Sequence, residues 1–253
     1  MADRPKLEVR GLTVRRSGRE VLRAVDLHVE RGEILAIVGP SGPAASVLLR
    51  CLNRMAELEP GVAVEGRVLL DGLDVYAPAI DPVALRRRVG LLLREPSPLP
   101  MFSIGENVLA GYRLAGEKPP RASELVEAML QRVGLWELAR DRLEASPFVL
   151  GPDARLRLCL ARCLALRPEV ILLDDPAASL DPAGTARFEE LVTELRAEAA
   201  IVVVTSNLQQ AARVADTAAL LLDGALVERA PSTQFFTNPS DPRTEDYLTG
   251  RFG

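Results

Sequence analysis

One stretch of the chain restricts its fold more than any other. An apolar run from residue 34 leads into a loop of glycine, proline and serine and then into a helix-like run (ILAIVGPSGPAASVLLRCLNRM). This order is typical of a βα unit whose loop can bind phosphate at the N-terminus of the helix. About 130 residues later, VILLDDPAASLDP begins with an apolar run that ends in two aspartates. Continuous runs of Val, Ile and Leu predict strands that are buried on both faces, and hence a largely parallel sheet covered by helices.

The rest of the chain supplies further strands and one helical segment. Residues 7–30 alternate in the manner of two antiparallel strands, with Ser17 and Gly18 as the turn between them. From about residue 96 to 150 the pattern changes to helices that are broken by proline and glycine. We therefore predict a single α/β domain over residues 1–253, with an N-terminal antiparallel β subdomain and an inserted helical subdomain.

The composition excludes several classes of function. A net charge of −4 and a pI near 5.3 provide no basic field for nucleic acid or for anionic lipid. No apolar run approaches the roughly 18 residues that span a bilayer, and the N-terminal segment lacks the pattern of a secretory signal. We expect a cytoplasmic protein that does not insert into the membrane and does not bind nucleic acid, so that any membrane association requires a protein partner.

The order of these segments resembles an ABC ATPase over essentially the whole chain. LLRCLNRM, EGRVLLDGLDVY, LRRRVGLLL, PSPLPMFSIGENV, SNLQQAARVAD and the terminal FTNPSDPRTEDYLTGRFG are similar to the ATP-binding subunit of bacterial phosphate importers. The resemblance implies a P-loop NTPase-like core and ATP with Mg²⁺ as cofactor. It also implies partners: membrane permease subunits and a second ABC ATPase subunit in a dimer, at the cytoplasmic face of the plasma membrane.

The resemblance places the family's P-loop, G-x-x-x-x-G-K-[ST], on eight residues: Gly39, Pro40, Ser41, Gly42, Pro43, Ala44, Ala45 and Ser46. The lysine slot is Ala45 and the adjacent glycine slot is Ala44, while Pro43 lacks an N–H that could face a phosphate. Ser46 and Asp174 occupy the magnesium slots. Because no Lys or Arg in the loop replaces the lost charge, we expect ATP to bind poorly.

Four other slots of the family also carry different residues: Arg16 for the aromatic residue that stacks on adenine, Arg94 for the glutamine, Asp175 for the glutamate and Ser206 for the histidine. An arginine can still stack on a base. Arg94 places a cation beside the magnesium site, which opposes metal binding unless it substitutes for the missing lysine charge. Asp175 is still a base, but a displacement of about 1 Å can cost roughly 10²-fold in rate.

The LSGGQ element of the family corresponds to residues 150–154, which are Leu150, Gly151, Pro152, Asp153 and Ala154. Its serine is replaced, Pro152 has no N–H, and we expect Asp153 to bring a carboxylate toward the partner's triphosphate. In ABC dimers each nucleotide lies between one subunit's P-loop and the other's LSGGQ element. Since both elements are altered here, pairing with an intact homologue would damage both composite sites.

Two functional hypotheses follow. The first is a non-hydrolysing protein of the phosphate-importer type that docks on permease or ATPase partners. The second is a weakly active ATPase that energises phosphate import, with Arg94 or Arg16 supplying charge and Asp175 acting as base. A third hypothesis is a protein that retains the fold but has no function, and the sequence alone does not distinguish it from the first. Residues 96–108 suit a groove for a permease helix, or they simply pack the helical insert.

Overall fold

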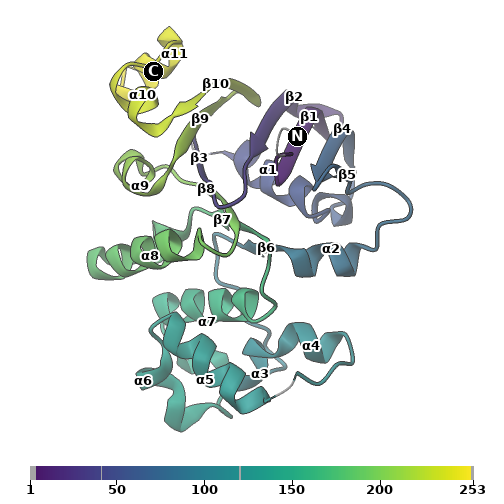
Figure 1. The fold of residues 1–253 in the computed structure, drawn as a ribbon, viewed down its shortest axis with the longest axis vertical. Coiled ribbons are helices and arrows are strands. Elements are labelled where there is room, and N and C mark those ends of the chain that lie inside the picture. Colours follow the sequence, from purple (N-terminus) through teal and green to yellow (C-terminus); the bar gives the residue numbers. More distant parts are fainter. Residues whose placement is uncertain (1–3, 41, 120, 252–253) are drawn as a thin grey trace.

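The computed structural model describes residues 4–40, 42–119 and 121–251, which form two sheets and the helices around them (Figure 1). The first sheet has the strand order β2-β1-β4-β5, and all neighbouring strands in it are antiparallel. Its strands are β1 (Leu7–Arg16), β2 (Arg19–Val29), β4 (Val62–Leu70) and β5 (Leu73–Asp74). The β1–β2 hairpin confirms the predicted strand pair, with the turn at Ser17 and Gly18.

The second sheet has the strand order β10-β9-β3-β8-β7-β6. Its pairs are parallel except β9–β10, which is antiparallel. Its strands are β3 (Ile34–Val38), β6 (Val89–Leu92), β7 (Val170–Asp174), β8 (Ala200–Val204), β9 (Thr217–Leu222) and β10 (Ala225–Pro231). The predicted α/β class with a mostly parallel sheet is confirmed.

The second sheet is buried on both faces because its central strands are apolar at every position. In β3, Ile34 and Ala36 face one hydrophobic core, and Leu35 and Ile37 face the other. One core lies between the two sheets and encloses α1 (Pro43–Leu52), while the other lies on the opposite face of the second sheet, under most of the other helices. The loop that precedes α1 therefore lies at the edge of a rigid, two-layered core.

The longer helices include those expected from the sequence, and α3 to α7 gather at the opposite end of the molecule from the first sheet (Figure 1). Besides α1 the helices are α2 (Pro82–Arg88), α3 (Ile104–Val108), α4 (Ala110–Leu114), α5 (Ala122–Arg132), α6 (Trp136–Ala139), α7 (Pro152–Leu164), α8 (Pro182–Leu195), α9 (Leu208–Val214), α10 (Ser232–Thr237) and α11 (Pro242–Leu248). Among the described residues, none of these helices has the length and apolar character needed to cross a bilayer.

Four short helices, α2, α9, α10 and α11, are absent from the sequence prediction. Two of them begin with the dipeptide Asp-Pro, in which the aspartate accepts hydrogen bonds from the first turn. Asp81 accepts from the N–H groups of Val83 and Ala84, at 3.0 and 3.3 Å, and Asp241 accepts from Arg243, at 2.9 Å. An N-cap followed by proline at the first helical position is a helix-start signal in its own right.

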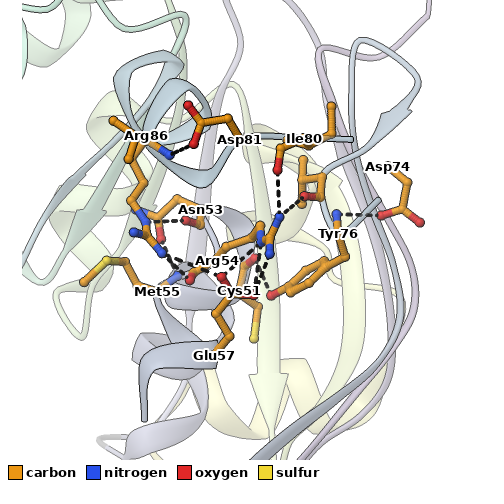
Figure 2. Close-up of polar contacts among 12 residues, drawn as sticks. Cys51, Asn53, Arg54, Met55, Glu57, Asp74, Tyr76, Ile80, Asp81 and Arg86 are labelled. Atoms are coloured by element: carbon orange, nitrogen blue, oxygen red, sulfur yellow. Dashed lines mark hydrogen bonds and ion pairs between the residues drawn. The ribbon is translucent and has the colours of Figure 1, made fainter. Parts of the chain in front are cut away.

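The C-terminal end of α1 is fixed by a cluster of polar contacts (Figure 2). The Tyr76 hydroxyl donates to the carbonyl of Cys51 at 3.0 Å. Arg86, from α2, donates to the carbonyls of Asn53 and Arg54 at 3.3 and 2.8 Å. Cations at a helix C-terminus satisfy its last carbonyls and complement its dipole. The helix that carries the phosphate loop at its start is thus anchored at its other end without any ligand.

Candidate functional site

A cavity of about 40 Å³ lies at the carboxyl ends of β3, β7 and β8, where ligands bind in open α/β sheets. It has room for water molecules. It brings together most of the residues that the sequence predicted for one site: Gly39, Pro40, Gly42, Ala44, Ala45, Ser46, Arg94, Asp174, Asp175 and Ser206. Ser41, also predicted for this loop, lies outside the described residues.

The described residues of the phosphate loop include a sterically required glycine but no lysine. Gly39 is required, since a Cβ there would lie 2.2 Å from the carbonyl oxygen of Leu221. Gly42 is the N-cap of α1 and supplies no side-chain cap, and Pro43 follows as the first helical residue. The methyl groups of Ala44 and Ala45 pack against the core between the sheets. The lysine slot thus presents an apolar group that contacts protein, with no cation to offer a phosphate.

The two residues in the magnesium slots contact each other directly. The Ser46 hydroxyl, in the first turn of α1, donates to Oδ1 of Asp174 at 3.0 Å. Asp174 ends β7 and is buried, and burial raises the pKa of its carboxyl against the opposing effects of the Ser46 hydrogen bond and of the nearby Arg94 and Arg50 cations. The two residues assigned to the magnesium slots thus lie side by side.

The residues in the glutamine and glutamate slots form an ion pair. Arg94, two residues beyond the end of β6, donates from its Nη2 atom to Oδ2 of Asp175. Asp175 is buried, has a positive φ of 44°, and donates its own N–H to the carbonyl of Val204 at 2.8 Å. The hydrogen bond to Asp175 raises the pKa of Arg94. The carboxylate that would polarise water is therefore already engaged by a protein cation.

Ser206 lies in the cavity lining, as the sequence predicted, but it is exposed at the end of β8. The turn that presents it is held by its neighbour. The buried Thr205 hydroxyl donates to Gln210 at 3.0 Å and accepts from the N–H of Asn207 at 3.1 Å. Ser206 is thus positioned at the cavity, with a short hydroxyl in place of an imidazole.

Arg16 is not brought into the cavity. It ends β1, and its guanidinium lies 3.6 Å from Glu59, which also pairs with Arg50 of α1. The predicted base-stacking residue is therefore occupied in an ion pair beside the first sheet. We find no contact that links it to the phosphate loop among the described residues.

The residues of the LSGGQ slot also lie outside the cavity, at the start of α7, where Gly151 is the N-cap and Pro152 the first helical residue. Asp153 has contacts within the chain that the sequence analysis did not include. Its carboxylate pairs with Arg157 one turn along the same helix, and its Oδ1 lies beside Gly184 of α8, 3.4 Å from where a Cβ would stand. An i,i+4 partner offsets the charge that was expected to repel a triphosphate.

Sequence reasoning missed one contact of the loop. The Tyr247 hydroxyl, from α11, accepts a hydrogen bond from the backbone N–H of Gly39, and burial raises the pKa of this tyrosine. Tyr247 also packs against the core beneath the second sheet. No local pattern could reveal a contact between positions about 200 residues apart.

The residues present do not fit the cofactor that the resemblance implies, which is ATP with Mg²⁺. Ser46 and Asp174 suit a divalent cation, since hydroxyl and carboxylate oxygens are its preferred ligands. Arg94 does not, because its charge adjoins both carboxylates. The loop also lacks the lysine that would reach the phosphates. The cavity thus combines groups that suit a metal with a cation that opposes one, and it offers a phosphate no lysine.

Comparisons with known proteins agree with this architecture. A family model described as ABC transporter matches residues 22–178. The phosphate import ATP-binding protein PstB of Salinibacter ruber (strain DSM 13855 / M31) is 44% identical over 250 residues, which cover 99% of this chain and 100% of that protein.

Two solved structures share the fold. The structure of an ATP binding subunit of an ABC transporter has a TM-score of 0.78 at 21% identity, and the match covers 96% of this chain and 99% of that one. CbiO1 from Clostridium perfringens, part of the ABC transporter complex cbiONQ, has a TM-score of 0.75 at 22% identity, with 98% and 96% covered.

Proposed function

This chain belongs to the ABC transporter family, and we propose that it is a phosphate-import-type ATP-binding-subunit homologue that does not hydrolyse ATP. In this proposal it acts as a scaffold that docks on permease or ATPase partners at the cytoplasmic face of the plasma membrane. The relative named as a phosphate import protein, which matches over nearly the whole chain, supports the type of transporter.

One observation carries the proposed lack of hydrolysis. Among the described residues that line the cavity, Arg94 is the one cationic side chain, and it is paired with Asp175. Hydrolysis needs positive charge on the phosphates and a free base for water. Here the Arg94–Asp175 ion pair engages both groups, so neither the cation nor the base is free to act on ATP. Groups that act together in a transition state are not rescued by a single survivor such as Asp174.

The docking part of the proposal concerns residues 96–108, between β6 and the end of α3. Ser103 and Glu106 form a capping box that starts α3, with hydrogen bonds of 3.3 and 2.8 Å. Met101 is 71% exposed at the tip of this segment. A rigid loop that presents an exposed apolar side chain suits an apolar face of a permease helix.

Calorimetry of MgATP binding, with a phosphate-release assay on the same sample, tests the lack of hydrolysis. We expect no binding at millimolar ATP and no turnover from the unaltered protein. The double variant Ala44→Gly with Ala45→Lys should bind metal-free ATP more tightly than the unaltered protein does, because it returns a flexible loop residue and a cation to the phosphate side. Micromolar binding with turnover by the unaltered protein would overturn the proposal.

That contrary outcome would support the second function, a weakly active ATPase that energises phosphate import. The observation in its favour is that Ser46, Asp174, Asp175 and Arg94 all line one cavity. In such an enzyme Arg94 would release Asp175 and contact phosphate. An Arg94→Ala variant would then lose turnover. If the unaltered protein does not hydrolyse ATP, the same variant leaves turnover at zero.

Docking is tested by co-purification with the phosphate permease subunits of the same organism. Met101→Glu should abolish co-purification, since it places a charge on the proposed apolar contact. Leu138→Glu is the matched control, because Leu138 is also exposed, at 46%, but lies on α6 outside this segment. Equal retention of both variants would contradict the assigned surface.

A further inference from the structure

The carboxylates of Asp174 and Asp175 are adjacent in sequence and both are buried, with exposures of 4% and 6%. Two like charges in a buried site must be compensated or one must bind a proton. In this structure each has a protein partner: Ser46 donates to Asp174, and Arg94 donates to Asp175. The chain itself thus supplies one positive charge, at Asp175, and one neutral hydrogen bond, at Asp174, where a nucleotide site has a divalent cation.

The charge count of the cavity supports this interpretation. Its described lining residues carry two carboxylates and one guanidinium. The resemblance places a lysine at position 45 and an uncharged glutamine at position 94. Here the positions hold Ala45 and Arg94, so one positive charge is absent from the phosphate side and one is present on the carboxylate side. Arg94 also acts on Asp174, whose pKa it lowers against the effect of burial.

We propose that Arg94 is a built-in substitute for the divalent cation, so that this site excludes Mg²⁺ and the substitution Arg94→Gln gives it metal affinity. The guanidinium cannot lose its proton at any physiological pH, and its charge repels a second cation that approaches the same carboxylates. Its fork also occupies an Asp175 oxygen that a metal or its water would use. This inference rests on the proposed non-hydrolysing function, because it concerns the same site.

The test measures Mn²⁺ alone, as a paramagnetic probe, on the purified full chain without nucleotide. Free Mn²⁺ is counted by electron paramagnetic resonance for the unaltered protein, Asp174→Asn, Arg94→Gln and Arg94→Gln with Asp174→Asn. We expect the unaltered protein to match Asp174→Asn. Arg94→Gln should gain a site that is about tenfold tighter or more, and the added Asp174→Asn should remove the gain.

Arg87→Gln is the matched control, because Arg87 is an arginine of the preceding helix that pairs with the exposed Glu117. It should leave Mn²⁺ binding unchanged. A second measurement follows the melting temperature: Mn²⁺ should raise it for Arg94→Gln and leave it constant for the unaltered protein, since a ligand that binds only the folded state stabilises it.

Tighter Mn²⁺ binding by the unaltered protein than by Asp174→Asn would overturn the inference, and this comparison holds even where Arg94→Gln does not fold. A folded Arg94→Gln that gains no Mn²⁺ would also overturn it. ATP hydrolysis by the unaltered protein in the presence of a chelator would instead overturn the proposed function and leave the exclusion of metal standing. The two failures are therefore distinguishable.

Discussion

Asn107 holds the proposed docking segment in its conformation, so its replacement tests whether that conformation matters for stability and for docking. It is fully buried at 0% exposure in α3. Its Oδ1 accepts from the N–H of Leu99 at 2.7 Å, and its Nδ2 lies 3.1, 3.1 and 2.9 Å from the carbonyls of Leu99, Phe102 and Ser103. One amide thus organises the loop that carries the proposed contact.

Asn107→Ala removes these hydrogen bonds and leaves backbone groups unsatisfied in a buried place. Each hydrogen bond contributes about 1 kcal/mol net, and water replaces some of them in the variant. We therefore expect the free energy of unfolding to fall by about 3 kcal/mol. For a chain of this size each kcal/mol corresponds to roughly 2–4 °C, so the melting temperature should fall by about 6–12 °C. The measurement is thermal unfolding followed by circular dichroism.

Gln131→Ala serves as the control, since its amide is exposed on α5 and donates to Glu127 at 3.0 Å. It should shift the melting temperature by no more than about 2 °C. If Asn107→Ala is no more destabilising than this control, the reasoning from buried hydrogen bonds is wrong. If it is destabilised but still co-purifies with permease subunits like the unaltered protein, the segment is not the docking surface.

Three further predictions concern the framework around the site. Gly224→Ala should destabilise the protein more than Gly18→Ala does. Both residues have a φ of +79°, but a Cβ at Gly224 would lie 2.3 Å from a carbonyl oxygen of β2, whereas a Cβ at Gly18 meets nothing within 4 Å. Equal losses of unfolding free energy, measured in urea, would refute this. Gly90→Ala should cost about 1–3 kcal/mol, because its Cβ would lie 2.3 Å from the Cys163 sulfur, and Cys163→Ala should restore much of it in a double-mutant cycle. The pKa of Glu169 is lowered to about 2, chiefly by a hydrogen bond from the guanidinium of Arg88. Its contribution to stability is therefore present at neutral pH and is lost as the pH falls from 4.5, the usual pKa of a glutamate, toward 2. The difference in melting temperature between the unaltered protein and Glu169→Gln should therefore shrink over that range, and a difference that stays constant would count against it.

The fold could be predicted where hydrophobic pattern and length agree. β3 and β8 are continuous apolar runs and β7 is apolar up to its last residue, Asp174, so their burial on both faces follows from that composition. α2 and α11 were missed because seven-residue helices show too few turns for periodicity to be read. Their Asp-Pro starts were the better signal, since capping is encoded by adjacent residues.

The site could be predicted where topology alone brings residues together. Asp174, Asp175 and Ser206 follow parallel strands whose carboxyl ends meet at one edge, so their shared cavity was foreseeable. The ion pair of Asp153 with Arg157, one turn along α7, follows from their i,i+4 spacing, but only the structure shows that it forms. The contact of Tyr247 with the loop depends on how α11 packs, which no local pattern contains.

Two altered residues of the cavity act on different ligands: Ala45 affects the binding of phosphate, and Arg94 affects the binding of metal. Recovery of activity therefore depends on both positions. Ala45→Lys places a second cation near Arg94, so the cavity would balance its two carboxylates and favour phosphate without metal. Arg94→Gln alone frees Asp175 for a metal but leaves nothing to hold a phosphate. Only the combined change gives a nucleotide and a metal compatible partners. Binding of MgATP should therefore be strongly non-additive across these two positions, because each substitution removes an obstacle that hides the effect of the other.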